Sequence, residues 1–583
     1  MNLKKAFIFF ACFSLPLFGV SIAIGEEVPA EQWVQSMKFE DGWKALTLDE
    51  TTVRETSVIY GTVYDASKGP LTSEQAREKY FCKDFLSEEC KKFFTLQFRA
   101  LLPVCDSFIN LNCLESVYAI KENGDKVLGV FEKYTQALPF AYPPSEKYGL
   151  PAGAYPSLWK IPGVKNGSGE EQYVATPFVY GSNKFENWKA DPQFKINQMF
   201  PALYAVKPLS GPEYRPIFAT DASTGPGKIA GSSNSGNNMC AAQDFGTCYL
   251  KYSLPLNTKL GMTFRVSKNL NPWIHGRVLN PEIKLMAIDG SNQLVDISGN
   301  PMVIGNLGTW TRVETLTPEL KEWILNAPHE NGGTGDWANH ASLTKTFAYN
   351  IGVSGQGNIN QLKIWLPVLG DKATVNPTAW SFRFLENREL LDADSCIKNT
   401  QGLAGIVTTN AAVYSAGPPT YNKANGSLDY TVISPHFDSS GKEFLGTYNL
   451  LIKDEVARCI YGFSDAPIKA EVSIVGDSGE NKVATTTVSK QGEWISLSAK
   501  GFTYSSPTIR VKLSQEKVEK AQEASSNTAA AAEASSNTAV AAEARSNTKP
   551  GALKKSITCS KGKSLKKVTG TNPKCPKGYK LVK

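Results

Sequence analysis

Ten of the eleven cysteines form five pairs along the chain, and their spacing constrains the fold more than any other sequence feature. The pairs are Cys82 and Cys90, Cys105 and Cys113, Cys240 and Cys248, Cys396 and Cys459, and Cys559 and Cys575. Ten cysteines allow roughly 945 sets of pairings, so disulfides within these pairs are a prediction and not a deduction. No pair has the C-x-x-C spacing typical of zinc and redox sites. We therefore expect disulfides that fix loops in an oxidising compartment.

The first residues have the pattern of an export signal. Lys4 and Lys5 precede the uncharged, mostly apolar stretch Ala6–Gly25, which ends in small residues before Glu26. This pattern predicts a signal peptide over residues 1–25, whose removal would also remove Cys12. Two alternatives stay open: the stretch stays as a membrane anchor, or Cys12 is lipidated. No other stretch is long and apolar enough to cross a membrane, so we expect no integral membrane segment after cleavage.

The length of 583 residues, with 42% hydrophobic residues, predicts several domains rather than one core. The fold class that we expect is mainly β and multi-domain, with β-sandwich-like modules, a low-complexity linker and a small disulfide-closed C-terminal module. The predicted domains are a mostly-β N-terminal domain (26–251) with three short disulfide loops, a β-rich domain (252–389) with a tryptophan cluster, a β-sandwich-like domain (390–514), a repeat linker (515–552) and a basic disulfide-closed tail (553–583).

Local patterns predict individual elements inside the three body domains. Strands are expected at 56–64, 95–102, 262–266, 282–288, 345–353, 361–366, 380–384, 427–433, 445–452, 457–462, 468–475, 482–488, 493–497 and 508–513. A hairpin is expected at 116–131 around Asn123-Gly124, and a second turn at Asp289-Gly290. Pro318–Leu325 is the one clear short helix. Gly352–Gly357 (GVSGQG) follows a strand, and we expect it to be a turn that opens no helix.

The linker consists of a repeat of ten residues. Glu523–Ala532, Glu533–Ala542 and Glu543–Ala552 repeat a pattern of Ala, Glu, Ser, Asn and Thr. These residues offer almost nothing to bury, so we expect no packed core. A period of ten also differs from the seven or eleven residues that a coiled coil requires.

The positive charge of the chain is concentrated at its C-terminal end. Lys549–Lys583 contains eleven lysines and no acidic residue, whereas the rest of the chain is slightly acidic. Such a tail is expected to bind an anionic surface, such as a wall polymer with phosphate or carboxylate groups. The candidate residues are Lys561, Lys563, Lys566, Lys567, Lys574 and Lys577. Alternatively, the lysines only keep the tail solvated. Export argues against nucleic acid as a partner.

Two C-terminal segments resemble parts of a known group of proteins. Ile557–Lys580 contains I-T-C, K-G-K, K-K-V-T, P-K-C-P and G-Y-K in this order, and it resembles a module that ends many secreted surface proteins of actinobacteria. Phe444–Leu513, with ARCIYGF and VATTTV, is similar to a β module found upstream of that tail. The family has no established activity, so the resemblance implies a location at the cell surface and an architecture, and it supplies no catalytic residue. Glu26–Leu385 lies largely outside it.

The sequence contains no diagnostic catalytic or metal-binding motif. It has no G-x-S-x-G elbow, no H-E-x-x-H and no Walker A sequence. With only four histidines in the chain, metal and histidine-based catalysis are disfavoured. We therefore name no catalytic residue and expect neither a metal nor another cofactor.

The Gly-rich loop Pro328–His340 is the strongest candidate for ligand binding. It brings together His329, Glu330, Asp336, Trp337, Asn339 and His340. The loop could hold a carbohydrate or a metal, with the tryptophan as a stacking face and the carboxylate and amide groups as hydrogen-bond partners. The more common alternative is a flexible exposed loop whose polar residues face water. Six of the eleven tryptophans lie between residues 273 and 380. We expect Trp323, Trp365 and Trp380 in the core, and Trp337 exposed.

The function that these patterns favour is a secreted, cell-envelope-associated binding or structural protein. Its tail would contact anionic wall polymers, and its β-domains would present a face that binds glycans or a surface. The alternative is a secreted polysaccharide hydrolase with its site in residues 252–385, where paired carboxylates cannot be chosen from sequence. A purely architectural coat protein is the third possibility.

Overall fold

The structure is a computed structural model of the 583-residue chain, and its contacts divide the chain into two units, Met1–Val518 and Glu519–Lys583. In the first unit it describes residues 41–48, 56–62, 80–136, 141–183, 193–212, 214, 240–326, 333–334, 339–373, 378–464, 467–475, 481–482, 485–504 and 508–515. In the second unit it describes residues 555–561, 564–570, 574–575 and 579–581. The chain is mainly β, as predicted.

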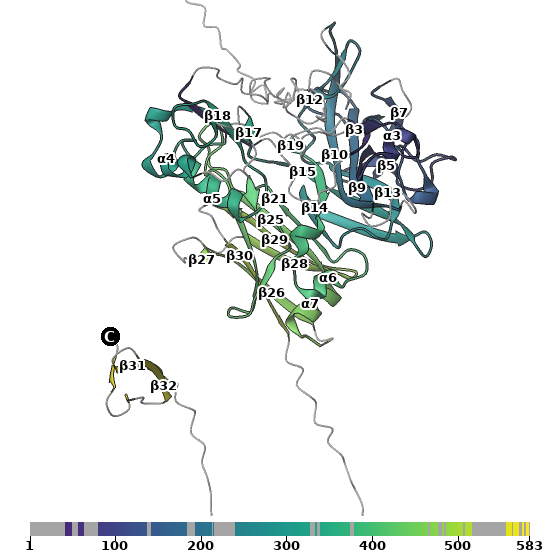
Figure 1. The fold of residues 1–583 in the computed structure, drawn as a ribbon. Coiled ribbons are helices and arrows are strands. Elements are labelled where there is room, and N and C mark those ends of the chain that lie inside the picture. The colour runs from purple at the N-terminus through teal and green to yellow at the C-terminus, as the bar shows by residue number, and fades with distance from the viewer. Residues whose placement is uncertain are drawn as a thin grey trace, which may run out of the picture. The chain divides into compact units, whose positions relative to one another are not determined.

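The N-terminal part of the first unit consists of two sheets that share one core (Figure 1). One sheet contains β2 (Val58–Thr62), β3 (Tyr80–Cys82), β4 (Thr95–Leu101), β7 (Val130–Tyr134), β8 (Ser157–Lys160), β9 (Gln172–Asn183), β10 (Phe194–Ser210), β11 (Cys240–Asp244) and β12 (Thr247–Tyr252). The other contains β5 (Cys113–Ile120), β6 (Lys126–Leu128), β13 (Lys259–Ser267), β14 (Trp273–Ala287) and β15 (Asn292–Val303). Alternating apolar residues such as Phe98 and Val179 on the first sheet pack with Val117 and Phe264 on the second.

A second pair of sheets forms the C-terminal part of this unit. One contains β20 (Ser381–Phe384), β21 (Gly405–Thr409), β25 (Gly446–Lys453), β28 (Thr485–Gln491) and β29 (Trp494–Phe502). It continues the large N-terminal sheet, because β20 also pairs with β10 at Ala202–Ser381. The other contains β22 (Val413–Tyr414), β23 (Thr420–Asn422), β24 (Ser427–Ile433), β26 (Ile468–Val475), β27 (Asn481–Lys482) and β30 (Thr508–Gln515). The core between them contains Leu450 and Leu497 from one sheet and Val432 and Val511 from the other.

A third core lies under a small mixed sheet and two helices (Figure 1). The sheet contains β1 (Trp43–Leu48), β16 (Leu307–Arg312), β17 (Gly333–Thr334) and β18 (Phe347–Asn350), and the helices are α4 (Pro318–Leu325) and α5 (Gln356–Trp365). Helix α4 begins as its sequence predicts, because Thr317 accepts a hydrogen bond from the Leu320 amide and proline occupies the first turn. Its buried residues Leu320 and Ile324 join Trp365 in this core.

The remaining described elements of the first unit are short. They are α3 (Glu88–Lys91), α6 (Ser395–Lys398), α7 (Asp454–Tyr461), β19 (Thr378–Ala379) and the 3-10 helices Glu146–Tyr148, Val313–Thr315 and Asn387–Leu390. None of the described helices has the length and hydrophobicity that a membrane span requires.

Strand β14 belongs to both halves of the first unit. Residues 273–277 pair with β20 on one edge and with β21 on the other, whereas residues 278–287 pair with β15. The register shifts between Leu279 and Glu282, and Asn280 between them has a φ of 48°. A bulge of this kind bends a strand, which lets one strand leave one sheet and enter another.

Strand pairing crosses both boundaries that sequence analysis places inside the body. Strand β5 pairs with β13 and β1 pairs with β16, across the expected boundary after residue 251. Strand β14 pairs with β21 across the expected boundary after residue 389. The three predicted body regions therefore share sheets within one unit, because edge strands of each region are completed by strands of the next. The division after Val518 falls inside the predicted linker.

Three local predictions are wrong. Of the stretches expected as strands, residues 361–365 lie in helix α5 and residues 457–461 in helix α7, and α5 begins at Gln356, within Gly352–Gly357. Short apolar runs do not distinguish a strand from a helix. In α5 the buried residues Ile359, Leu362 and Trp365 follow a helical spacing, and α7 ends at Gly462 with a φ of 67°.

Four of the five predicted cysteine pairs are disulfide-bonded: Cys82–Cys90, Cys105–Cys113, Cys240–Cys248 and Cys396–Cys459. The first three close loops between neighbours in sequence, and the fourth joins α6 to α7 across a separation of 63 residues. Cys575 is also disulfide-bonded. Its bond to Cys559 stays a prediction, because the side chain of Cys559 lies outside the described part of the structure.

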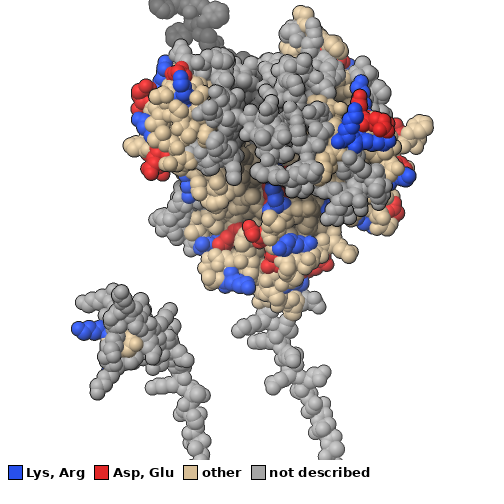
Figure 2. Space-filling model, viewed as in Figure 1, with Lys and Arg blue, Asp and Glu red and all other residues tan. Residues whose placement is uncertain are grey.

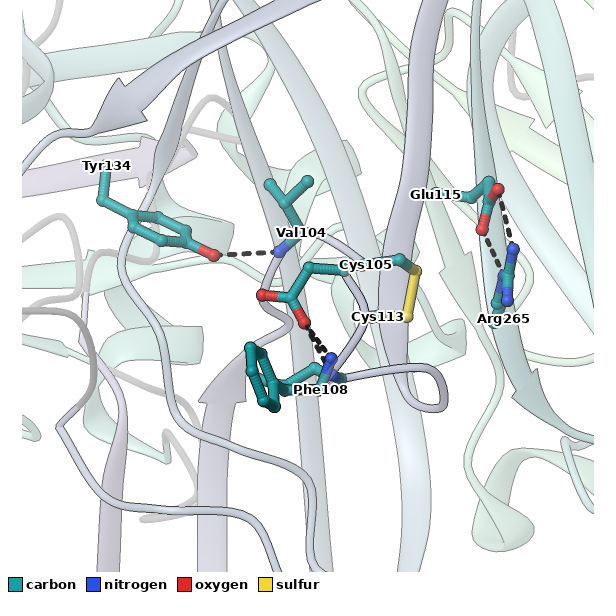
Figure 3. The surroundings of a disulfide bond; sticks show 9 residues. Val104, Cys105, Phe108, Cys113, Glu115, Tyr134 and Arg265 are labelled. Carbon is teal, nitrogen blue, oxygen red and sulfur yellow. Dashed lines mark hydrogen bonds and ion pairs between the residues drawn. A yellow bond between two sulfur atoms is a disulfide. The ribbon is translucent and has the colours of Figure 1, made fainter.

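Hydrogen bonds hold the Cys105–Cys113 loop in one conformation (Figure 3). The Asp106 carboxylate accepts bonds from the amides of Phe108 and Ile109, both at 2.7 Å, and the Tyr134 hydroxyl accepts one from Val104 N at 3.0 Å. Directly after the loop, Glu115 pairs with Arg265 through two hydrogen bonds. The loop is therefore a rigid structural element, as its disulfide predicts.

The second unit contains a 3-stranded sheet. Its strands are β31 (Lys555–Lys561), β32 (Ser564–Gly570) and β33 (Lys580–Leu581), in the order β32-β31-β33. A chain this short cannot bury a large core, so a disulfide is its expected source of stability.

Two buried tryptophans allow a test of how much side-chain hydrogen bonds contribute to the free energy of unfolding. Trp380 Nε1 donates to the carbonyls of Leu260 and Gly299 at 3.1 and 3.0 Å, whereas no described residue accepts a bond from Trp365 Nε1. Both residues are almost fully buried. We expect Trp380→Phe to reduce the free energy of unfolding by at least about 1 kcal/mol more than Trp365→Phe, because it removes two buried hydrogen bonds. Urea unfolding of the two variants measures the difference, and equal losses would contradict it.

Candidate functional site

A cavity of about 300 Å³ lies where strands β10, β14 and β20 meet. Strand β10 contacts β20 at the pair Ala202–Ser381, next to the antiparallel pairing of β20 with β14. The described lining consists of Thr176, Phe200, Pro201, Ala202, Tyr204, His275, Gly276, Arg277, Ile351, Gly352, Val353, Ser381, Phe382, Arg383 and Tyr414. The cavity thus has apolar walls and a small set of polar groups, which is the usual composition of a small-molecule site.

The register of β14 and β20 places the polar groups of the cavity. His275 lies directly across from Arg383, and Arg277 across from Ser381. Residues two apart on a strand share a face, so these four side chains point to one side of the sheet. Between them, Gly276 cannot carry a side chain, because a Cβ there would lie 2.9 Å from the Phe382 ring and 3.0 Å from Thr408 Cγ2.

Arg383 is held by a carboxylate outside the lining. Its Nη1 donates to both carboxylate oxygens of Glu389 at 2.7 Å, and both side chains are largely buried. Glu389 lies in the 3-10 helix Asn387–Leu390, where it also accepts a hydrogen bond from the Glu386 amide. No described residue accepts a bond from Arg383 Nε, which is buried. The guanidinium is therefore fixed in direction but not fully satisfied.

His275 is a neutral, buried hydrogen-bonding group. Its Nδ1 lies 3.4 Å from Arg383 Nη2, and because a guanidinium only donates, Nδ1 must accept. The proton therefore sits on Nε2, which lies 3.3 Å from both the Gly417 carbonyl and the Tyr430 hydroxyl. Burial lowers the pKa of His275 well below 6.5, and the positive charges of Arg383 and Arg277 lower it further.

Arg277 is the second arginine of the described lining. Its Nη1 donates to the carbonyls of Thr409 and Ala411 at 2.5 and 2.7 Å, where the chain leaves strand β21. Its guanidinium lies 4.8 Å from the ring centre of Tyr414, a cation–π distance. Arginine stays protonated in proteins, so the charges of Arg277 and Arg383 do not titrate, and the charge of Arg383 is balanced by the Glu389 carboxylate.

The predicted ligand-binding loop is only partly described. His329, Glu330, Asp336 and Trp337 lie outside the described residues. Asn339 is half-buried and His340 is 6% exposed, with its ring 6.3 Å from that of Phe347. His340 therefore contributes to the core under the small sheet. Its role in ligand binding stays a prediction.

The other sequence-predicted residues have separate locations. Trp365 and Trp380 are buried, as predicted, and Trp323 is half-buried. Of the candidate lysines of the tail, Lys561, Lys566 and Lys567 lie in β31 and β32, and Lys574 is exposed; Lys563 and Lys577 lie outside the described residues. The described residues contain no cluster of three or more side chains that could hold a metal ion.

Sequence reasoning missed the cavity residues because they are far apart in the chain. One signal could have found them: charged or polar residues interrupt runs that are otherwise apolar, as in Trp273–Val278 (WIHGRV) and Ser381–Phe384 (SFRF). Buried charged residues are rare and need a structural or functional reason.

Comparison of the chain with protein-family models, with curated proteins and with solved structures finds no match. The cavity must therefore be interpreted from its own chemistry.

The buried imidazole predicts a loss of stability in mild acid. Because the pKa of His275 is lower in the folded than in the unfolded chain, the unfolded chain binds the proton more tightly. The contribution of neutral His275 to the free energy of unfolding is complete above pH 6.5. Below pH 6.5 it declines by up to about 1.4 kcal/mol per pH unit. We expect His275→Gln to flatten this decline between pH 6.5 and 5 in urea unfolding.

His436 provides the matched control for this experiment. It is a half-exposed histidine whose Nδ1 lies 2.7 Å from Asp371 Oδ2. His436→Gln should leave the decline that His275 causes in place. An unchanged pH dependence in His275→Gln would contradict the assignment of a buried neutral imidazole.

Proposed function

We propose that this protein is exported and retained at the cell envelope, where it acts as a binding or structural protein. The observation that carries the proposal is the division of the chain into a disulfide-bonded body and a separate lysine-rich unit. Disulfides between Cys82 and Cys90 and between Cys396 and Cys459, among others, support an oxidising compartment. The predicted signal peptide, residues 1–25, lies outside the described residues.

The charge of the second unit supports an anionic partner. Eleven lysines without an acidic residue between Lys549 and Lys583 create a field that attracts polyanions. On the face of the body drawn in Figure 2, basic and acidic side chains are interspersed. Wall polymers with phosphate or carboxylate groups are therefore the expected partners of the tail, and the resemblance to secreted actinobacterial surface proteins favours the same location.

The chemistry of the cavity favours binding over hydrolysis. A polysaccharide hydrolase in residues 252–385 would need two carboxyl groups on either side of the scissile bond. The described cavity in this region is instead lined by two guanidinium groups and a neutral imidazole. Binding of glycans by the loop around Trp337 stays a separate prediction.

The proposal predicts that the tail retains the protein on cell envelopes. Full-length protein should co-sediment with envelopes of the producing organism and should be released as salt rises, because salt screens exposed charges over about 8 Å at physiological ionic strength. A chain ending at Thr548 should stay in the supernatant. Replacing Lys561, Lys563, Lys566, Lys567, Lys574 and Lys577 by glutamine should reduce binding, whereas replacing them by arginine should preserve it.

Two outcomes would contradict this proposal. Equal sedimentation of the truncated chain would show that the body, and not the tail, binds the envelope. Binding that does not respond to salt would show that the lysines do not act through their charge.

A further inference from the structure

We propose that Asn425 is a site of spontaneous deamidation, in which its side-chain amide is converted to a carboxylate. This inference concerns the body of the protein and does not depend on the function proposed for the tail. It rests on a comparison of the Asn-Gly pairs in the sequence. The pairs that begin at Asn123, Asn166 and Asn425 are described, and the pair that begins at Asn331 lies outside the described residues.

The reaction needs an asparagine, the residue that follows it and water. The backbone nitrogen of the following residue attacks the side-chain carbonyl carbon, its proton passes to the departing amide nitrogen, and ammonia leaves. The product is a succinimide ring, which water opens at either carbonyl to give aspartate or isoaspartate. Glycine is the most favourable following residue, because it has no Cβ to obstruct the attack and its backbone is the most adaptable.

Asn425 combines an exposed position with an unengaged side chain. It lies in the turn between β23 and β24 and is exposed. The Gly426 amide donates to the Asn422 carbonyl at 2.8 Å, whereas no described residue bonds the side-chain amide of Asn425. The space where a Cβ of Gly426 would lie is open. The attack therefore requires the loss of one hydrogen bond at an exposed turn, where local opening is easiest.

Asn123 is the matched comparison, because it is exposed and lies in a turn as well. Its side chain, however, is held by Asp125. Asn123 Nδ2 donates to Asp125 Oδ2 at 2.7 Å, and Asn123 Oδ1 accepts a bond from the Asp125 amide at 3.1 Å. The Gly124 amide donates to the Lys121 carbonyl at 2.8 Å. Two side-chain bonds therefore stabilise the unreacted state of Asn123 and are absent at Asn425.

Asn166 is protected by burial. It is 6% exposed, and its Nδ2 donates to the carbonyls of Gln172 and Val206 at 2.9 and 3.1 Å. The Gly167 amide donates to the Ser253 carbonyl at 2.9 Å. These bonds join separate segments of the body, so the reaction at Asn166 requires the body to open.

Peptide mapping by mass spectrometry measures the three rates in one sample. The full-length folded protein is incubated in mildly alkaline buffer made with heavy-oxygen water, which labels each acid formed during the incubation. We expect Asn425 to react at least about fivefold faster than Asn123, because hydrogen bonds hold the Asn123 side chain, and Asn166 to react slowest. In the reduced, unfolded chain this order should disappear, since all three asparagines precede glycine.

Two variants separate the effect of structure from that of sequence. Asp125→Ala removes the acceptor of Asn123 Nδ2, so it should speed the reaction at Asn123 and leave that at Asn425 unchanged. Asn425→Gln should abolish the label in its peptide, because the longer side chain would have to close a larger ring. Circular dichroism confirms that both variants are folded.

Hydroxylamine provides an independent readout, because it cleaves the chain at succinimides. Treatment of the folded protein should cut after Asn425 first. Asn425 lies inside the loop closed by Cys396–Cys459, so the two fragments should separate on a gel only after reduction.

The proposal is overturned if Asn123 or Asn166 reacts as fast as Asn425 in the folded protein. It is also overturned if Asn425 stays intact in the folded protein while it reacts in the unfolded chain. Unchanged reactivity of Asn123 in Asp125→Ala would contradict the protective role of the side-chain hydrogen bonds.

Discussion

The first unit depends on one strand that belongs to two sheets. Residues 273–277 of β14 are hydrogen-bonded on both edges, to β20 and β21, while residues 278–287 continue into the pairing with β15. Because backbone groups in a buried strand must be paired, the two sandwiches cannot separate at this point without leaving donors and acceptors unsatisfied. The bulge around Asn280 turns the strand from one sheet into the other. The cavity lies at this corner, where β10 contacts β20 at the pair Ala202–Ser381.

The polar side chains at this corner complete the backbone hydrogen bonding that the sheets leave open. Arg277 supplies donors to the carbonyls of Thr409 and Ala411, where β21 ends. His275 links Arg383 to the Gly417 carbonyl, and Tyr430 donates to the Ser415 carbonyl beside it. Such a network fixes its members in direction, because each buried polar group that loses a partner incurs a desolvation cost.

Elements whose signals lie in neighbouring residues can be predicted from the sequence. Elements and pairings that depend on contacts between distant residues cannot. The hairpin around Asn123-Gly124 and the helix Pro318–Leu325 have local turn and capping signals, and both form as predicted. Residues 361–366 and 457–462 lack such signals, and their helical state is set by the cores against which they pack. Pairings such as Ala45 with Trp310 join segments hundreds of residues apart, so no local pattern could reveal that the expected domains share sheets. The position of the cavity depends on the same long-range pairing, since its arginines come from separate strands, although their place inside apolar runs marks them as unusual.

The placement of the disulfides separates two ways of stabilising this chain. Those at Cys82–Cys90, Cys105–Cys113 and Cys240–Cys248 each close eight residues, so they fix loops and do not connect sheets. The described body therefore relies on shared strands and three large cores, whereas the small C-terminal sheet has little apolar surface to bury. Two units stabilised independently and joined by a repeat of low complexity can bind independently as well.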